Sequence, residues 1–222
     1  MVEHFGVTLL QPEADLRLSR ENYICTTRDG RYYLEDGRLK HSPERWEPLR
    51  QAALENFDRT MAYCDRLDQG AFADAIEAVR GRFPQLEAVE DLGRWRDVHG
   101  VYVMVLDRYR QAYVGLARSR GGIRQRILVH WQRKLAFNRL LSGPAAESIL
   151  SIDSFRALDT TRILAAATGR PGEAGAREAA SRLERAVFEA LPGEFLCNRT
   201  LAGDLPGGLH EAMVRRRTRQ LV

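Results

Sequence analysis

Two short apolar runs in the middle of the chain are its clearest pattern of hydrophobic and polar positions. Residues 101–106 form a nearly continuous apolar run, which is typical of a strand buried on both faces. Residues 107–110 form a polar turn, and residues 112–116 form a second apolar run. The pattern therefore predicts a β-hairpin.

Apolar positions three or four residues apart predict helices on both sides of this hairpin. One stripe comes after Ser42 and Pro43, residue types suited to a helix N-cap and first turn. It consists of Trp46, Leu49, Ala53, Phe57, Met61 and Cys64. A second helix is predicted over residues 71–82. A third begins at Gly121-Gly122, and its stripe consists of Ile123, Ile127, Trp131 and Leu135. A last helix is predicted over residues 175–191, before Pro192.

The remaining segments read as strands or as irregular chain. Residues 22–41 contain strand-like runs separated by Asp29-Gly30 and Asp36-Gly37, which predicts a small β-meander because Asp-Gly suits tight hairpin turns. Residues 138–160 read as irregular, and residues 161–166 as a third strand. From residue 98 onward the order is β-β-α-β-α, so we expect one sheet with helices packed on it.

These elements predict an α+β protein with a small, mostly antiparallel sheet and flanking helices. We expect residues 1–90 to form a separate N-terminal α+β module that packs on the rest of the chain. Residues 91–205 would hold the sheet domain, and residues 206–222 a basic tail that includes Arg215, Arg216, Arg217 and Arg219.

Composition narrows the class of protein but not its activity. The chain has 222 residues, 44% apolar and 29% charged, as expected of a soluble globular protein. The net charge of +4 permits nucleic-acid binding. Almost all basic residues are arginine, which pairs two phosphate oxygens at once, although genomic base composition alone also explains this usage.

The cysteines and the N-terminus indicate a compartment. Cys25, Cys64 and Cys197 are scattered, odd in number and without a CxxC spacing, which argues against a disulfide framework or a zinc knuckle. No signal peptide and no membrane-length apolar run is recognisable. We therefore expect a cytoplasmic protein without a membrane partner.

The two apolar runs also carry a motif. Gly100-Val101-Tyr102 begins just before the first run, Tyr113-Val114-Gly115 lies within the second, and a basic helix with Arg126 and His130 comes next. Further on, Glu184 lies in Leu183–Phe188 before Pro192, and Asn198 comes after it. In this order the residues resemble the GIY-YIG endonuclease family, over roughly residues 98–200.

The resemblance implies roles for these residues. Tyr102 would be the general base or the relay to a metal-activated water, with Tyr113 and His130 orienting water and phosphate. Arg126 would stabilise charge on the phosphate, and Glu184 would bind Mg²⁺ or Mn²⁺. The expected substrate-binding residues are Gly115, Arg118, Arg120, Arg124 and Asn198. Members of the family often carry a lysine after the second tripeptide. Here Leu116-Ala117 take that place, and Arg118 or Arg120 is the nearest substitute.

The residues support parts of this interpretation without the family. Arg126 and His130 are four apart and share a helix face, which is either a phosphate site or a solvated basic face. Ala180, Val187 and Phe188 surround Glu184 on its helix, and a carboxylate there requires either a metal or a buried salt bridge to an arginine. Tyr102 and Tyr113 are equally compatible with core packing. Asn198 is compatible with a loop turn or with a tie to the active-site strand.

Together these features predict a metal-dependent endonuclease that hydrolyses phosphodiester bonds in DNA, with recognition supplied by residues 1–90. Two alternatives stay open. One is a catalytically inactive nucleic-acid-binding module of the same fold, and the other is a nuclease for RNA or structured DNA. A homodimer would suit double-strand cleavage, but no residue pattern indicates one.

Overall fold

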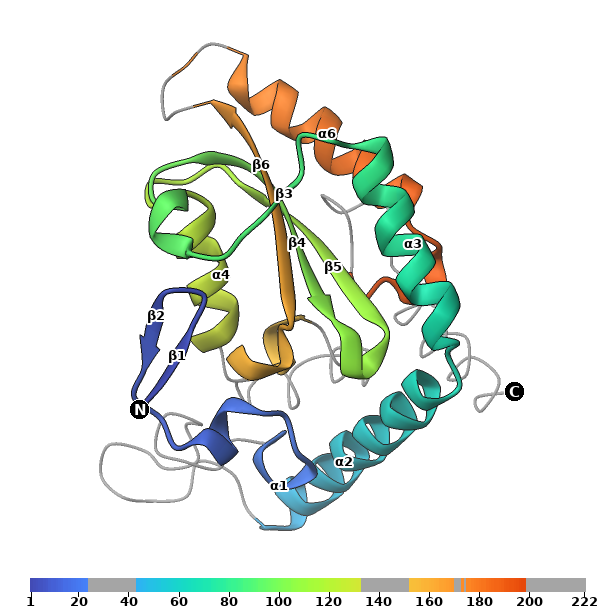
Figure 1. The fold of residues 1–222 in the computed structure, drawn as a ribbon. Coiled ribbons are helices and arrows are strands. Elements are labelled where there is room, and N and C mark those ends of the chain that lie inside the picture. Colours follow the sequence, from blue (N-terminus) through green and yellow to red (C-terminus); the bar gives the residue numbers. More distant parts are fainter. Residues whose placement is uncertain (24–42, 133–151, 170–172, 174, 199–222) are drawn as a thin grey trace.

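The computed structural model describes residues 1–23, 43–132, 152–169, 173 and 175–198. This part of the chain is α+β, with small antiparallel sheets and flanking helices, which confirms the predicted class. A two-stranded ribbon is formed by β1 (Val2–His4) and β2 (Val7–Leu9). The main sheet has the strand order β3-β6-β4-β5 (Figure 1). Its strands are β3 (Glu87–Ala88), β4 (His99–Leu106), β5 (Gln111–Ala117) and β6 (Arg162–Gly169).

The predicted hairpin consists of β4, an inner strand of the main sheet, and β5, an edge strand. Every residue of β4 is buried, because β5 and β6 pair with its two edges and helices cover both of its faces. This double burial explains why residues 101–106 of the strand form a nearly continuous apolar run instead of alternating with polar residues. A short 3₁₀ helix, Asp107–Tyr109, turns the chain and ends at Arg110, whose φ of 48° is left-handed.

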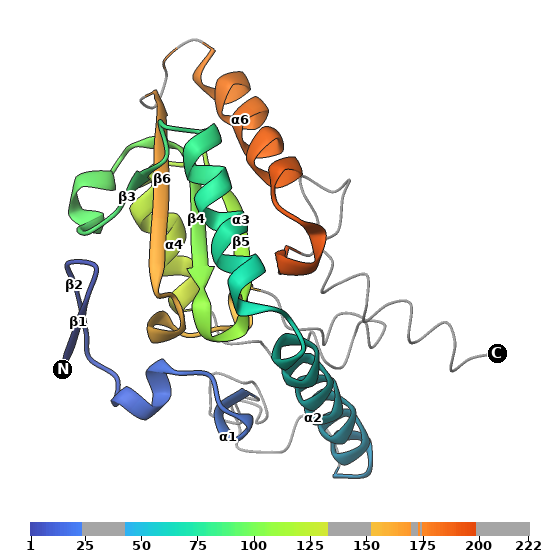
Figure 2. The ribbon, with the colours of Figure 1, turned by 45° about the vertical axis from the view of Figure 1, so that its right-hand side comes forward.

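Helices cover both faces of the sheet (Figures 1 and 2). The helices α3 (Gln69–Arg82) and α6 (Ala176–Ala190) pack on one face, which carries Val101, Val103 and Val105 of β4. The helix α4 (Gly122–Gln132) packs on the other face, with Tyr102, Met104 and Leu106. The alternation of side chains along β4 therefore decides that Tyr102 faces α4.

The first 90 residues share both cores with the sheet and are not a separate module. Phe72, Ile76 and Val79 of α3 are buried in the same cluster as the valines of β4, and β3 is an edge strand of the main sheet. On the other face, the ring of Phe5 lies 6.3 Å from that of Trp131. The predicted boundary at residue 90 therefore corresponds to no break in packing, because the chain before it supplies a strand and a helix to the sheet.

The predicted helices are present, with small differences at their ends. The helix α2 spans Pro43–Asp65, and α3 begins at Gln69 because the Asp68 carboxylate accepts a hydrogen bond from the Ala71 amide at 2.6 Å. None of the described helices is long and apolar enough to cross a membrane.

The meander prediction is wrong where the structure can test it. Tyr23 ends the short helix α1 (Arg20–Tyr23) instead of beginning a strand. Ser19 and Asn22 exchange hydrogen bonds between side chain and amide at 2.9 and 3.2 Å, which stabilises a helical turn. The remaining meander residues, Leu135 and the basic tail lie outside the described residues.

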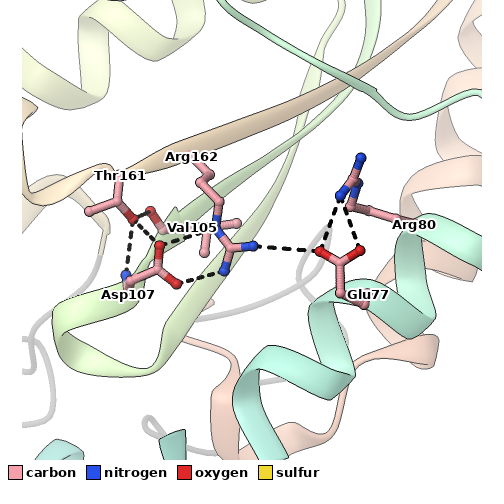
Figure 3. A network of polar contacts seen from close by, with 6 residues as sticks. All are labelled: Glu77, Arg80, Val105, Asp107, Thr161 and Arg162. Carbon is pink, nitrogen blue, oxygen red and sulfur yellow. Dashed lines mark hydrogen bonds and ion pairs between the residues drawn. The ribbon is translucent and has the colours of Figure 1, made fainter. Parts of the chain in front are cut away.

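A polar network fastens α3 to the turn end of the sheet (Figure 3). Asp107 accepts hydrogen bonds from Nη2 of Arg162 at 2.6 Å and from the Thr161 hydroxyl at 2.6 Å. A second guanidinium nitrogen of Arg162 lies 3.8 Å from Glu77 on α3, and Glu77 also pairs with Arg80 at 3.0 Å. The network aligns α3 over the strands, although exposed pairs of this kind contribute only about 0–1 kcal/mol each.

Candidate active site

The ring of Tyr102 occupies space that a side chain at position 115 would fill. Tyr102 and Gly115 are direct partners in the β4–β5 register. A Cβ atom at Gly115 would stand 2.3 Å from Cζ of Tyr102 and 2.4 Å from its hydroxyl oxygen. The glycine therefore lets a fully buried phenol lie across the neighbouring strand.

A chain of hydrogen bonds leads from this phenol to an acidic residue. The Tyr102 hydroxyl oxygen lies 2.8 Å from Nε2 of His130, and Nδ1 of His130 lies 2.6 Å from Oδ1 of Asp153. An ionised carboxylate only accepts, so Nδ1–H donates to Asp153. In neutral imidazole Nε2 is then an acceptor, and the Tyr102 hydroxyl donates its hydrogen to it.

Arg126 adds positive charge to the same place. Burial raises the pKa of Tyr102 well above its ordinary value and Tyr113 adds to this effect, whereas the Arg126 guanidinium beside the phenol opposes it. Arg126 is partly exposed, and its shared helix face with His130 is directed at Tyr102. Of the two interpretations of this face, a solvated basic surface is therefore wrong for His130, which is only 2% exposed.

Tyr113 completes the aromatic part of the cluster. Its ring centroid lies 6.1 Å from that of Tyr102 and 5.0 Å from that of His130, with an edge-to-face orientation to the imidazole. Burial raises the pKa of Tyr113 to about 12, with Arg126 opposing the shift and the Asp153 carboxylate, and to a smaller extent that of Glu184, adding to it. Tyr113 is partly exposed, so it stands between the buried Tyr102 and the surface.

Glu184 lies on the buried face of α6 and is 9% exposed. Burial raises the pKa of its carboxyl, and the charge of Arg118 opposes this. Among the described residues, none donates a hydrogen bond or an ion pair to the Glu184 carboxylate. Arg118 donates instead to the hydroxyl of Ser181 at 2.5 Å. The buried salt bridge considered as an alternative is therefore not formed within the part of the chain that the structure describes.

The Glu184 carboxylate is a candidate ligand for a cation that keeps most of its water. No three His, Cys, Asp or Glu side chains gather as a metal site in the described ranges. A four-ligand cage of the zinc type is therefore not supplied there. Mg²⁺ is commonly held by one or two carboxylates and retains several waters, and the unbonded Glu184 carboxylate fits that requirement.

Asn198 ties the chain after α6 to the edge strand β5. Its side-chain oxygen accepts from the Val114 amide at 3.0 Å, and its side-chain nitrogen donates to the Val114 carbonyl at 2.7 Å. The Cys197 amide also donates to the Ala112 carbonyl at 3.0 Å. Asn198 is 2% exposed, so its side chain positions β5 and is not displayed to a substrate.

The other arginines predicted to bind substrate make no hydrogen bond to the tyrosines among the described contacts. Arg118 and Arg120 are exposed after the end of β5. Arg124 lines a cavity of about 380 Å³ between the β1–β2 ribbon and α4, together with Leu128 and Trp131. Arg124, Leu128 and Trp131 are four and seven residues apart, so they share one face of α4. This face is not the one that carries Arg126 and His130.

Asp153 was not predicted from the sequence. It lies in the short 3₁₀ helix Ile152–Ser154, inside the segment expected to be irregular, and its side chain is 13% exposed. The contact with His130 spans 23 positions in the chain, so no local periodicity reports it. The signal that could have indicated Asp153 is its position as an acidic residue between Ile152 and Phe155, which are both buried.

Comparisons with protein-family models, with curated proteins and with solved structures give no match for this chain. The chemistry of the site is therefore inferred from its geometry.

Proposed function

We propose that this chain is a divalent-metal-dependent endonuclease of the GIY-YIG type that hydrolyses phosphodiester bonds in DNA. One observation carries the proposal: Tyr102, Tyr113, His130 and Arg126 converge at β4, β5 and α4. Glu184, buried on α6 and without a hydrogen-bond partner among the described residues, is the proposed cation ligand. Such a group combines a proton acceptor, a phosphate-binding cation and a metal-binding carboxylate, the parts that phosphodiester hydrolysis requires.

Each residue has a step to perform. Tyr102 passes its hydroxyl proton to Nε2 of His130, and its oxygen then takes a proton from the attacking water. The water oxygen forms the new bond to phosphorus as the bond to the 3′-oxygen breaks, and the 3′-oxygen takes a proton from solvent to leave as the alcohol. Arg126 stabilises the negative charge of the phosphate. A divalent cation held by Glu184 would supply positive charge against the leaving oxygen. Tyr113 and Arg126 are the partly exposed residues of the cluster, so phosphate and water would approach it from their side.

Substrate contact beyond the cluster is assigned by charge and position. Arg118 comes after the edge strand and lies beside α6, so it is the better substitute for the lysine usual in the family.

In the first 90 residues, Arg50 and Arg59 of α2 are at least partly exposed, although they lie 3.6 and 3.9 Å from Glu47 and Glu55. Arg50→Gln with Arg59→Gln should weaken DNA binding if α2 takes part in recognition. Unchanged affinity at low salt would rule out that part of the proposal.

Plasmid nicking in Mg²⁺ tests the function itself. Wild type should nick supercoiled DNA, and chelation should stop it. Tyr102→Phe and Glu184→Ala should each lower the rate by about 10²-fold or more, since they remove the proton acceptor and the cation ligand. Glu189→Ala, an exposed carboxylate on the same helix, is the matched control and should leave the rate unchanged.

Two results would overturn the proposal. Equal nicking by wild type, Tyr102→Phe and Glu184→Ala would show that the cluster is not catalytic. DNA binding without cleavage by folded wild type would favour a binding module. Branched DNA and RNA, run beside the plasmid, report the preferred substrate.

A further inference from the structure

We infer that Asp153 is a positioning residue: its carboxylate fixes His130 as the Nδ1–H tautomer, so that Nε2 is free of hydrogen and accepts from Tyr102. The effect on turnover rests on the proposed function, whereas the tautomer does not. The two parts can therefore fail separately.

The two hydrogen-bond partners of the His130 imidazole determine which ring nitrogen carries the hydrogen. Its two nitrogens face two different groups, the Tyr102 hydroxyl at 2.8 Å and the Asp153 carboxylate at 2.6 Å. The carboxylate accepts only, whereas the hydroxyl can donate or accept. The acidic partner therefore decides which nitrogen carries the hydrogen, and the tyrosine adapts to that choice.

The surroundings strengthen this control. The His130 side chain is 2% exposed and that of Asp153 is 13% exposed, so water competes weakly for either nitrogen. The Tyr113 ring packs edge-to-face with the imidazole, at 5.0 Å between ring centroids, and restricts its rotation. In the opposite tautomer, the Nε2–H group of His130 would face Tyr102. Nε2 could then not accept the proton of the Tyr102 hydroxyl.

A second histidine provides an internal reference. Nε2 of His4 lies 2.9 Å from the Thr160 carbonyl oxygen, which only accepts. His4 must therefore carry its hydrogen on Nε2, the reverse of His130. One spectrum of the full-length protein should contain both tautomers, with the His4 signal independent of Asp153.

The test is ¹⁵N–¹H long-range correlation of the histidine rings in the full chain. Wild type should show His130 as the Nδ1–H tautomer. Asp153→Asn should convert His130 wholly or partly to Nε2–H and leave His4 unchanged. Tyr102→Phe should leave His130 as Nδ1–H, because the carboxylate is intact. This second variant decides the question if Asp153→Asn does not fold.

Kinetics adds the functional part. Asp153→Asn should lower kcat for plasmid nicking about 10²-fold with KM changed less than about threefold, since orientation acts on proton transfer and not on binding. Asp153→Glu should recover part of the lost rate. Asp58→Asn, which removes an exposed partner of Arg20, is the control and should behave as wild type.

Three results would overturn the inference. They are an Nε2–H tautomer of His130 in wild type, an unchanged His130 tautomer in Asp153→Asn, and loss of the Nδ1–H form in Tyr102→Phe. If wild type does not cleave any nucleic acid, the proposed nuclease activity fails while the tautomer result still decides the role of Asp153.

Discussion

Replacing Gly115 with alanine tests how far the tyrosine cluster depends on the space at that position. The new Cβ would meet the Tyr102 ring, which is buried on every side and cannot retreat without breaking its bond to His130. We expect Gly115→Ala to lower the free energy of unfolding by about 1–3 kcal/mol, as overpacking does, and to lower nicking more than stability explains. Urea denaturation and the nicking assay measure the two effects.

Gly81 is the matched control for this substitution. It lies in α3 and an added Cβ would meet nothing within 4 Å. Gly81→Ala should leave nicking unchanged and stabilise the protein by about 0.4–1 kcal/mol. If both substitutions have the same effect on stability, the close fit of Tyr102 on Gly115 is not the cause.

Glu184 gives a prediction in pH. Its carboxyl pKa is raised from 4.5 by burial, so the folded chain holds the proton more tightly than the unfolded chain. This contribution to stability is full below the unfolded pKa and is lost as the pH rises through the folded pKa. Glu184→Gln stays neutral, so its stability relative to wild type should improve as the pH rises above 4.5 and through the raised pKa of the folded chain. Urea denaturation across this range measures the difference.

Mg²⁺ should change that comparison. A cation bound at Glu184 in the folded state raises the Tm of wild type as its concentration increases, whereas Glu184→Gln should not respond. Glu189→Gln, exposed on the same helix, should behave as wild type in both experiments. An equal response of Glu184→Gln and wild type to Mg²⁺ would place the cation elsewhere.

At the scale of elements, local periodicity explains which parts could be predicted. Spacing of apolar residues identified α2, α3, α4 and α6 and the β4–β5 hairpin, because burial of one helix face or of a whole strand leaves a repeating pattern. The same spacing put Arg126 and His130 on one face and Glu184 among apolar neighbours. Asp153, the edge strand β3 and the packing of α3 on β4 depend on contacts between distant segments, which no local pattern records.

The attachment of the segment after α6 to β5 gives a prediction at this scale. Asn198 satisfies both the amide and the carbonyl of the buried Val114. Asn198→Ala should lower the free energy of unfolding by about 1–3 kcal/mol for each group left unpaired. Chemical denaturation measures the loss. Asn198→Asp keeps the acceptor but not the donor, so it should not restore stability. Wild-type stability of Asn198→Ala would mean that the attachment is dispensable.

At the scale of the whole molecule, the first 90 residues belong to the fold of the sheet. A chain of residues 91–222 would lose β3 and the cover of Phe72, Ile76 and Val79 over β4. We expect it to lack a cooperative urea transition and to bind hydrophobic dyes, because one face of the sheet becomes exposed. A cooperative transition in this shortened chain would show instead that the sheet domain folds alone. Loss of DNA affinity after such a deletion would therefore not identify a recognition module.

The contact between Tyr102 and Gly115 also orders the changes that the chain can accept. Gly115→Ala meets a steric conflict only while the phenol is present, so the same substitution should be nearly harmless in a Tyr102→Ala background. The two positions are thus epistatic. A lineage could lose the tyrosine first and the glycine afterwards at little further cost, whereas the reverse order passes through a damaged intermediate. In a divergent copy of this chain, a residue other than glycine at position 115 would then indicate that Tyr102 had been replaced earlier.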